Sequence, residues 1–223
     1  MNHTNYNPEA TFRPGFIANR KEGDPSTCRL GGEAWTATGP RPDLGNPALL
    51  VTVDCRTPVL HQAINGECSV EIPLFSHLNL AGIIPQQEYE LDHAAQHATF
   101  KPFDAKVALL PMRDRLPIPL PESPLRLREM RADELWTDEA SYWVALDSFL
   151  GGQGVIRLFG PPPYIDYVAP AKDGYRYFAG IGYESPSQTD GLLGSEAFIP
   201  GEVAQYFFIS RDWKTIRVIT QAT

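Results

Sequence analysis

The sequence predicts a β-rich α+β fold, a mostly antiparallel sheet with short peripheral helices. The chain has 223 residues, of which 43% are hydrophobic and 21% charged, so it can bury an ordinary globular core. Its 21 prolines and 18 glycines interrupt nearly every stretch that could form a long helix. Many short strands joined by turns tolerate that spacing, whereas a helical bundle does not.

The start of the chain differs in character from the rest. Residues 1–27 carry Asn, Pro, Gly and Asp with little hydrophobic periodicity, so an extended N-terminal arm is expected there. Residues 28–223 contain no obvious linker and no low-complexity tract, and they are expected to form a single β-rich domain.

Strand signals dominate the first half of the chain. The first strand is expected over residues 48–54, where an unbroken apolar start indicates burial on both faces. The pair Asn65-Gly66 lies between β-compatible runs and favours a hairpin turn, and a further strand is expected over residues 72–80. Residues 86–97 are expected to form a short polar helix.

The second half contains the strongest helix signal. Residues 103–110 are strand-like, and the prolines of 116–124 require an extended segment. A helix is predicted over 138–150, with Thr137 as N-cap and Gly151-Gly152 as the C-terminal stop. Strands are expected over residues 155–159, 164–168, 175–181, 203–210 and 215–220.

The number of cysteines and the hydropathy of the chain indicate the cellular compartment in which the protein is expected. Cys28, Cys55 and Cys68 cannot all pair with one another in one chain. Residues 1–11 are polar and lack the apolar segment of a signal peptide. Reduced thiols in a cytoplasmic protein are therefore expected. The longest apolar runs are far too short to span a bilayer, so no membrane is expected among the partners.

Three segments share short hydrophobic motifs with a known family. Residues 29–35 read Arg-Leu-Gly-Gly-Glu-Ala-Trp, residues 72–80 form an apolar run, and residues 201–219 include Gln-Tyr-Phe-Phe-Ile followed by a final strand. Together they resemble the YwqG-like family of bacterial proteins, a domain of unknown function, although Ala34 stands where the family has proline. The resemblance implies a β-rich fold and carries over no catalytic residue. Some such proteins are thought to protect cells against secreted toxins, which is an analogy only.

Histidines offer the sharpest chemical hypothesis. On a helix, His93 and His97 would lie on one face at the spacing by which two imidazoles share a metal. However, Ala94 occupies the position of the glutamate that the zincin pattern needs. A third ligand would have to come from His61, His77 or Glu88, so neither a metal nor another cofactor is expected.

Other catalytic motifs are incomplete. Residues 151–154 are glycine-rich but precede a strand and lack the Gly-Lys-Ser/Thr of a phosphate loop. Ser195 lacks the second glycine of a nucleophile elbow. No catalytic residue is therefore predicted.

The charge distribution points to a protein partner. The formal net charge of −8 disfavours nucleic acid, because a negative field repels phosphates. Residues 132–150 contain only acidic charges, together with several aromatic side chains. An ordinary solvated helix face is one interpretation. The other is an acidic docking surface with aromatic anchors, made of Asp133, Glu134, Trp136, Asp138, Glu139, Tyr142 and Trp143.

These observations favour a non-enzymatic protein-binding module over an enzyme. The most specific form of this prediction is a cytoplasmic immunity protein that neutralises a cationic toxin, for example a nuclease, encoded nearby. The alternative is a small-molecule-binding or hydrolytic enzyme with a site around His77, His93 and His97. The sequence makes no prediction of oligomeric state.

Overall fold

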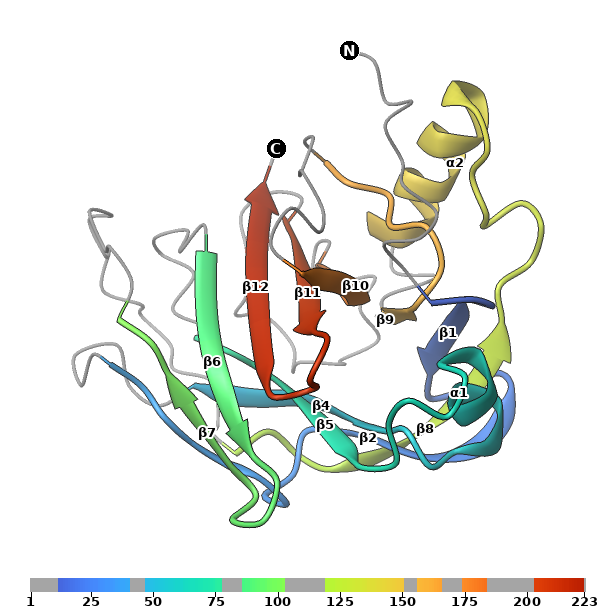
Figure 1. Ribbon diagram of the computed structural model, residues 1–223. Coiled ribbons are helices and arrows are strands. Elements are labelled where there is room, and N and C mark those ends of the chain that lie inside the picture. Colours follow the sequence, from blue (N-terminus) through green and yellow to red (C-terminus); the bar gives the residue numbers. More distant parts are fainter. Residues whose placement is uncertain are drawn as a thin grey trace.

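The computed structural model describes residues 12–40, 47–77, 86–102, 119–150, 156–165, 174–183 and 203–222. Within them, the strands form one nearly closed, barrel-shaped sheet in the order β3-β7-β6-β12-β11-β10-β9-β1-β8-β2-β4-β5 (Figure 1). The strands are β1 (Phe16–Asn19), β2 (Asp24–Leu30), β3 (Thr36–Thr38), β4 (Ala48–Asp54), β5 (Glu71–Ser76), β6 (Gln86–Asp92), β7 (His97–Phe100), β8 (Ser123–Glu129), β9 (Ile156–Leu158), β10 (Tyr175–Tyr183), β11 (Val203–Ser210) and β12 (Thr215–Ala222). The helices are α1 (Pro58–Ala63) and α2 (Glu139–Leu150).

The predicted β-rich fold is confirmed, but the predicted sheet needs correction. The sheet is mixed, because β3 and β7 pair in parallel at one edge, and it curls into a barrel. Parallel neighbours need a crossover between segments distant in sequence, which no local pattern reveals. Neither helix in the described part of the chain is long and apolar enough to cross a membrane.

The described part of the expected N-terminal arm belongs to the sheet. β1 pairs with both β8 and β9, and β2 pairs with β4 and β8. Phe16, Ile17 and Ala18 are buried, so residues 12–27 contribute to the core as well as to the hydrogen-bond ladder.

The helix predicted over residues 86–97 is wrong, since this segment is a β-hairpin. β6 and β7 pair antiparallel from Tyr89↔Phe100 to Asp92↔His97. Alternate residues of β6 are buried, which is the period of a strand. The Asp92 carboxylate accepts the N–H groups of Ala94 and Ala95, both at 3.0 Å, and so closes the turn.

The hairpin predicted at Asn65-Gly66 is also wrong. The preceding residues form α1, which has Pro58 in its first turn. Asn65 and Gly66 then adopt φ angles of +53° and +71°, and the Gly66 N–H donates to the His61 carbonyl at 2.9 Å. The pair therefore ends a helix. Asn and Gly adopt positive φ readily, and a helix end requires this as much as a hairpin turn does.

Other boundaries follow the predictions more closely. The strands over 48–54 and 203–210 and the helix over 138–150 are confirmed, as are strands near 155–159, 175–181 and 215–220. The strand predicted over 72–80 runs over Glu71–Ser76, and residues 164 and 165 are not in a strand. Residues 103–110, 116–118, 151–154 and Ser195 lie outside the described residues. The described end of 116–124 leads into β8, to which Ser123 and Pro124 belong.

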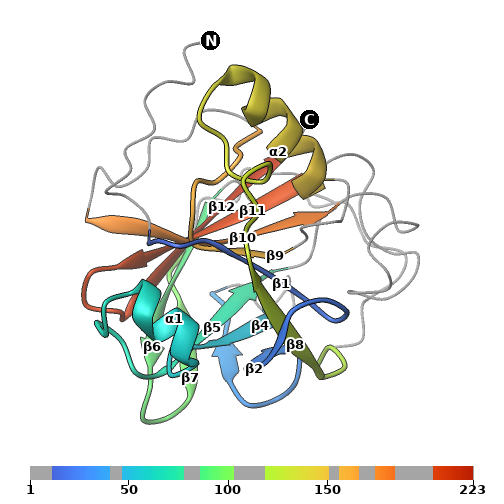
Figure 2. The ribbon, with the colours of Figure 1, turned by 90° about the vertical axis from the view of Figure 1, so that its right-hand side faces the viewer.

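The barrel wall has an apolar face on each side at β10 and β11. Phe207 and Ile209 point into the main core, whereas Tyr206 and Phe208 belong to a second cluster with α2. Helix α2 covers this outer face (Figure 2). It packs directly on the strand backbone, because a Cβ at Gly182 would lie 2.5 Å from the Phe149 carbonyl oxygen.

Side chains of β6 link that strand to β5, the last strand in the sheet order. The Tyr89 hydroxyl donates to the Pro73 carbonyl at 3.0 Å and accepts the Phe75 N–H at 2.9 Å. The Gln87 amide oxygen accepts the His77 N–H at 3.0 Å. These bonds satisfy buried backbone groups of β5 where the barrel nearly closes.

Candidate functional site

The acidic segment predicted to bind a partner leads into α2 and forms that helix. Asp138 is the N-cap in place of the predicted Thr137, because its carboxylate accepts the Ser141 N–H at 2.8 Å. The Ser141 hydroxyl in turn accepts the N–H groups of Thr137 (3.0 Å) and Asp138 (3.1 Å). The Ser141 N–H and the Ser141 hydroxyl both donate to the Asp138 carboxylate, and these two bonds lower the pKa of Asp138, because they stabilise its charged form.

Helix α2 carries apolar side chains on its outer face as well as its inner face. Tyr142, Leu146, Phe149 and Leu150 are buried against the barrel. Outside this buried face, Trp143 is 47% exposed and Val144 is 57% exposed. Among the described residues, the only other large hydrophobic side chain with comparable exposure is Val59 on α1. A surface helix normally keeps such a face polar.

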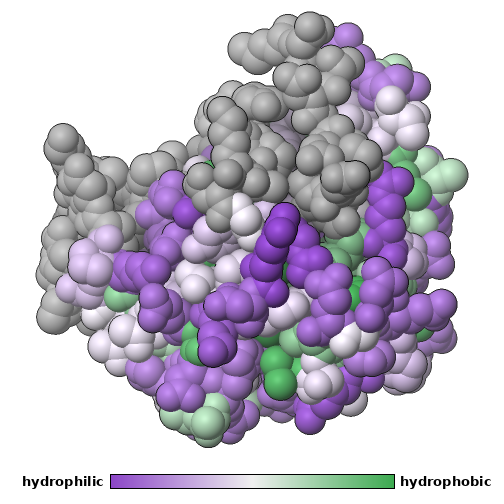
Figure 3. All heavy atoms as spheres, in the orientation of Figure 1, coloured by the Kyte–Doolittle hydropathy of each residue, from purple (hydrophilic) through white to green (hydrophobic). Residues whose placement is uncertain are grey.

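Carboxylates flank the exposed Trp143. Glu139 and Asp147 lie four residues before and after it, and therefore one turn away on the same helix face. Both are exposed, and residues 132–150 contain no Lys or Arg. In the space-filling view, the part of the surface formed by α2 mixes hydrophilic residues with paler, less hydrophilic ones (Figure 3). We call Glu139, Trp143, Val144 and Asp147 the α2 strip.

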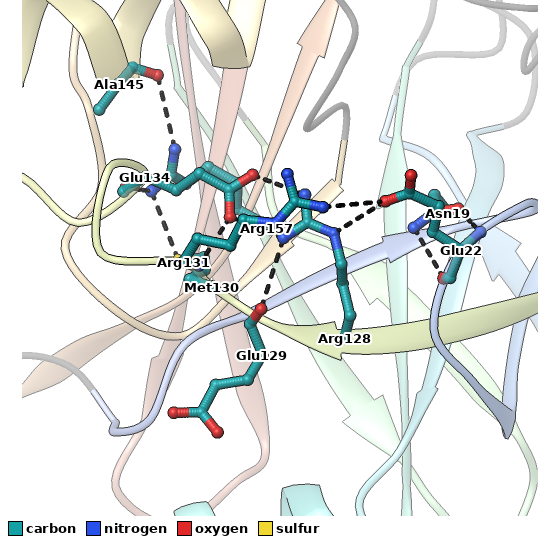
Figure 4. A network of polar contacts seen from close by, with 9 residues as sticks. All are labelled: Asn19, Glu22, Arg128, Glu129, Met130, Arg131, Glu134, Ala145 and Arg157. Atoms are coloured by element: carbon teal, nitrogen blue, oxygen red, sulfur yellow. Dashed lines mark hydrogen bonds and ion pairs between the residues drawn. The ribbon is translucent and has the colours of Figure 1, made fainter.

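Glu134, expected on the docking surface, is instead a buried scaffold residue. Its carboxylate binds the Arg128 guanidinium through two bonds of 2.5 and 2.6 Å and accepts the Arg131 N–H at 2.8 Å (Figure 4). Burial disfavours the charged form, yet these donors hold the pKa of Glu134 below its ordinary value. A partner therefore meets no free carboxylate at this position.

A buried arginine ties the same segment to the barrel. Arg157 of β9 is 1% exposed, and its guanidinium donates to the main-chain carbonyls of Glu134 and Ala145 (Figure 4). Burial lowers the pKa of Arg157, since charge is costly away from water. Arg157 thereby fixes the loop before α2 and the middle of α2 at once. This role went unpredicted, because nothing local distinguishes Arg157 from a surface arginine.

The structure shows which of the seven residues predicted to bind a partner are accessible. Asp133, Asp138, Glu139 and Trp143 are exposed, and Trp136 is half-buried with its ring 5.2 Å from that of Tyr142. Tyr142 is buried and donates its hydroxyl to the Tyr164 carbonyl. Of the seven residues predicted, Glu134 and Tyr142 are therefore inaccessible. Val144 and Asp147 are also exposed on α2 but were not among the predicted residues, although the i, i+4 spacing of Trp143 and Asp147 was visible in the sequence.

The histidines do not share a helix face. His93 contacts the Trp213 carbonyl through Nε2 at 3.0 Å. The ring of His97 contacts the hydroxyls of Thr36 and Thr38, at 2.8 and 3.1 Å. His77 is buried against Phe100, and burial lowers its pKa to about 4. Across the described ranges, no group of three His, Cys, Asp or Glu side chains is arranged to hold a metal ion.

A second feature missed from the sequence is a polar layer inside the barrel. The apolar alternation of β6, β11 and β12 continues at the same end of the barrel into Gln87, Gln205 and Thr220, all buried. The Ser76 hydroxyl accepts the amides of Gln87 (3.2 Å) and Gln205 (2.7 Å). The described side chains satisfy one another there, as buried polar groups require.

Comparison with protein-family profiles, with curated proteins and with solved structures finds no match to this chain. The resemblance to the YwqG-like family therefore stays a prediction.

Proposed function

We propose that this protein is a non-enzymatic protein-binding module that docks a basic protein partner through the α2 strip. The observation that carries the proposal is the exposure of Trp143 (47%) and Val144 (57%) on a helix that is already packed by its other face. Tryptophan is the residue most enriched among interface anchors, because it buries a large area with few rotatable bonds.

The charges beside the anchor indicate the chemistry of the partner. Glu139 and Asp147 lie on either side of the indole, and a Lys or Arg side chain stacked on that ring would contact a carboxylate on each side. The net charge of −8 would steer a cationic protein toward this surface. The most specific form of the proposal is an immunity protein that neutralises a cationic toxin encoded nearby. A nuclease fits this chemistry, because its active surface is basic.

The binding kinetics of the purified full chain with the product of the adjacent gene test this proposal. Trp143→Ala should weaken the complex by about 30-fold, mainly through faster dissociation. Glu139→Gln combined with Asp147→Asn should slow association severalfold and reduce its dependence on salt.

The matched control is Val59→Ala, which truncates another exposed hydrophobic side chain (43%), on α1, apart from α2 in both ribbon views (Figures 1 and 2). It should leave the affinity unchanged. Absence of a complex at micromolar concentration, or an equal loss with Val59→Ala and Trp143→Ala, would count against docking by the α2 strip. Thermal unfolding of each variant separates lost binding from lost stability.

A further inference from the structure

Three cysteine side chains belong to one part of the core, beside α1. Cys28 lies in β2, Cys55 directly follows β4, and Cys68 lies between α1 and β5. All three are free and buried within the main hydrophobic cluster. The three thiols differ in their immediate surroundings, and this difference decides which of them can react together.

The backbone brings Cys55 and Cys68 together across the base of α1. The Cys55 N–H donates to the Val70 carbonyl at 3.1 Å and so extends the pairing of β4 with β5 by one step. The Cys68 carbonyl is held by His61 Nδ1 of α1 at 3.1 Å. Within this frame the Cys55 and Cys68 thiols interact with each other, which raises the pKa of Cys55 and lowers that of Cys68. The two side chains are therefore neighbours before any reaction.

Cys28 is engaged elsewhere. Its N–H donates to the Ser26 hydroxyl at 3.2 Å, and its thiol lies beside Ser26, Asp54 and Thr57, which all act on its pKa. Burial raises the pKa of Cys28, and the Asp54 carboxylate adds to that rise, because a second negative charge nearby is unfavourable. Cys28 is thus a poor nucleophile. It lies close enough to Cys55 to raise the pKa of that thiol as well, so Cys28 is the competing partner that the test has to exclude.

We propose that Cys55 and Cys68 form a redox site that closes to an intramolecular disulfide when the protein meets a peroxide. This inference is independent of the proposed docking function, since the pair lies beside α1 and not on α2. The disulfide would join the end of β4 to the segment that returns from α1, enclosing residues 55–68 in one covalent loop.

Cys68 is the better attacking thiol. It is 5% exposed and lies between the exposed residues Glu67 and Ser69, whereas Cys55 is 0% exposed. The interaction with Cys55 lowers the pKa of Cys68 although burial opposes it, and the same interaction together with burial raises the pKa of Cys55. The thiolate is the nucleophilic form, so the first step belongs to Cys68.

The chemistry balances with hydrogen peroxide as the oxidant. The Cys68 thiolate attacks one peroxide oxygen, the O–O bond breaks, and a sulfenic acid and hydroxide form. The Cys55 sulfur then attacks the Cys68 sulfur and gives up its proton. The S–O bond breaks and water leaves, so two thiols are oxidised and one peroxide is reduced to two waters. A small thiol such as glutathione reverses the reaction by exchange.

The disulfide can be located by digestion with trypsin, because this protease places each of the three cysteines in a separate peptide. Cleavage after Lys21, Arg29, Arg56 and Lys106 puts Cys28, Cys55 and Cys68 in peptides 22–29, 30–56 and 57–106. The native full chain is treated with a slight excess of hydrogen peroxide, unreacted thiols are alkylated under denaturing conditions, and the digest is analysed by mass spectrometry.

The expected result is that free thiols fall from three to one and that peptides 30–56 and 57–106 are joined with the loss of two hydrogens. The melting temperature should rise by about 6–12 °C, since a loop of this length restrains the unfolded chain. Cys28→Ser should still form the link, whereas Cys55→Ser and Cys68→Ser should not. A link that includes peptide 22–29, or three free thiols after treatment of the natively folded chain, would overturn the proposal. The linked peptides of the wild-type protein alone decide which cysteines pair. The test therefore holds even if a serine variant is unstable.

Discussion

Replacing Glu134 by Gln separates a scaffold role from a docking role more sharply than any other single change. The substitution keeps the shape of the side chain but removes its charge. In the native structure that charge is bound by two hydrogen bonds from Arg128 and one from the Arg131 main chain, and the residue is 7% exposed. The Glu134 carbonyl also anchors Arg157.

The expected cost follows from these contacts. A hydrogen bond to a charged group contributes about 1.5–3 kcal/mol, and breaking a well-buried ion pair costs about 3–5 kcal/mol. The Arg128 side chain is 16% exposed and also contacts Glu22 at 3.2 Å, so solvent and a second carboxylate compensate in part. We therefore expect Glu134→Gln to lower the free energy of unfolding by about 2–4 kcal/mol. The melting temperature should fall by about 5–15 °C.

The pH dependence gives a second signature of this role. The pKa of Glu134 in the folded protein lies below its ordinary value of 4.5, so its stabilisation is fully present above about pH 4.5. That stabilisation is lost as the pH falls through the folded pKa. The difference in stability between wild type and Glu134→Gln should therefore be constant at neutral pH and shrink in acid.

Urea unfolding of wild type, Glu134→Gln and Glu139→Gln, followed between pH 3.5 and 7, measures these quantities. Glu139 is the matched control, because it is an exposed glutamate five residues along the same segment. Its replacement should change stability by less than about 0.5 kcal/mol. Equal effects of the two substitutions, or a Glu134→Gln variant as stable as wild type, would refute the scaffold role.

Two further predictions test the core and the packing of α2. His77 is buried and its pKa falls from 6.5 to about 4, so the unfolded chain takes up the proton first and stability should decline by about 3 kcal/mol from pH 6.5 to 4. In urea titrations, His77→Gln should make the free energy of unfolding less dependent on pH between 6.5 and 4. An unchanged pH dependence in this variant would contradict the prediction. Gly182→Ala would place a Cβ 2.5 Å from the Phe149 carbonyl oxygen, so we expect a loss of about 1–3 kcal/mol in thermal unfolding. A neutral effect would mean that α2 is less tightly packed on β10 than the structure shows.

Local patterns predicted several elements well. The strand Val203–Ser210 was predicted with the bounds that the structure has, because most of its residues, above all the run Tyr206–Ile209, favour strands. Helix α2 was found from its acidic start and from the glycines that follow it in the sequence. The same local reasoning failed for β6, where acidic and amide side chains suggested a helix while Tyr89 and Leu91 alternate as in a strand. It failed at Asn65-Gly66 because a pair that tolerates positive φ serves a hairpin and a helix end equally.

For the candidate sites, too, the sequence predicted the location of a segment but not the environment of each side chain. The sequence located an acidic, aromatic segment at 132–150, but it could not distinguish Glu134 from Glu139, since each is a glutamate in the same charged stretch. What separates them is Arg128 on β8, whose guanidinium binds the Glu134 carboxylate at 2.5 Å. Likewise, the cysteines were expected to be reduced, but nothing in their spacing showed that the Cys55 and Cys68 thiols interact with each other.

By itself, the sequence determined the β-rich character of the fold, helix α2, several strand boundaries and the acidic nature of the α2 segment. These properties depend on backbone propensity, short-range periodicity and composition, all of which act within a few residues. Only the tertiary structure decided that the sheet curls into a mixed barrel and that Glu134 and Tyr142 face inward. It also decided that Trp143 and Val144 face outward and that two thiols meet. Each of these depends on how the segments pack in three dimensions, which the residue pattern within a single element does not specify.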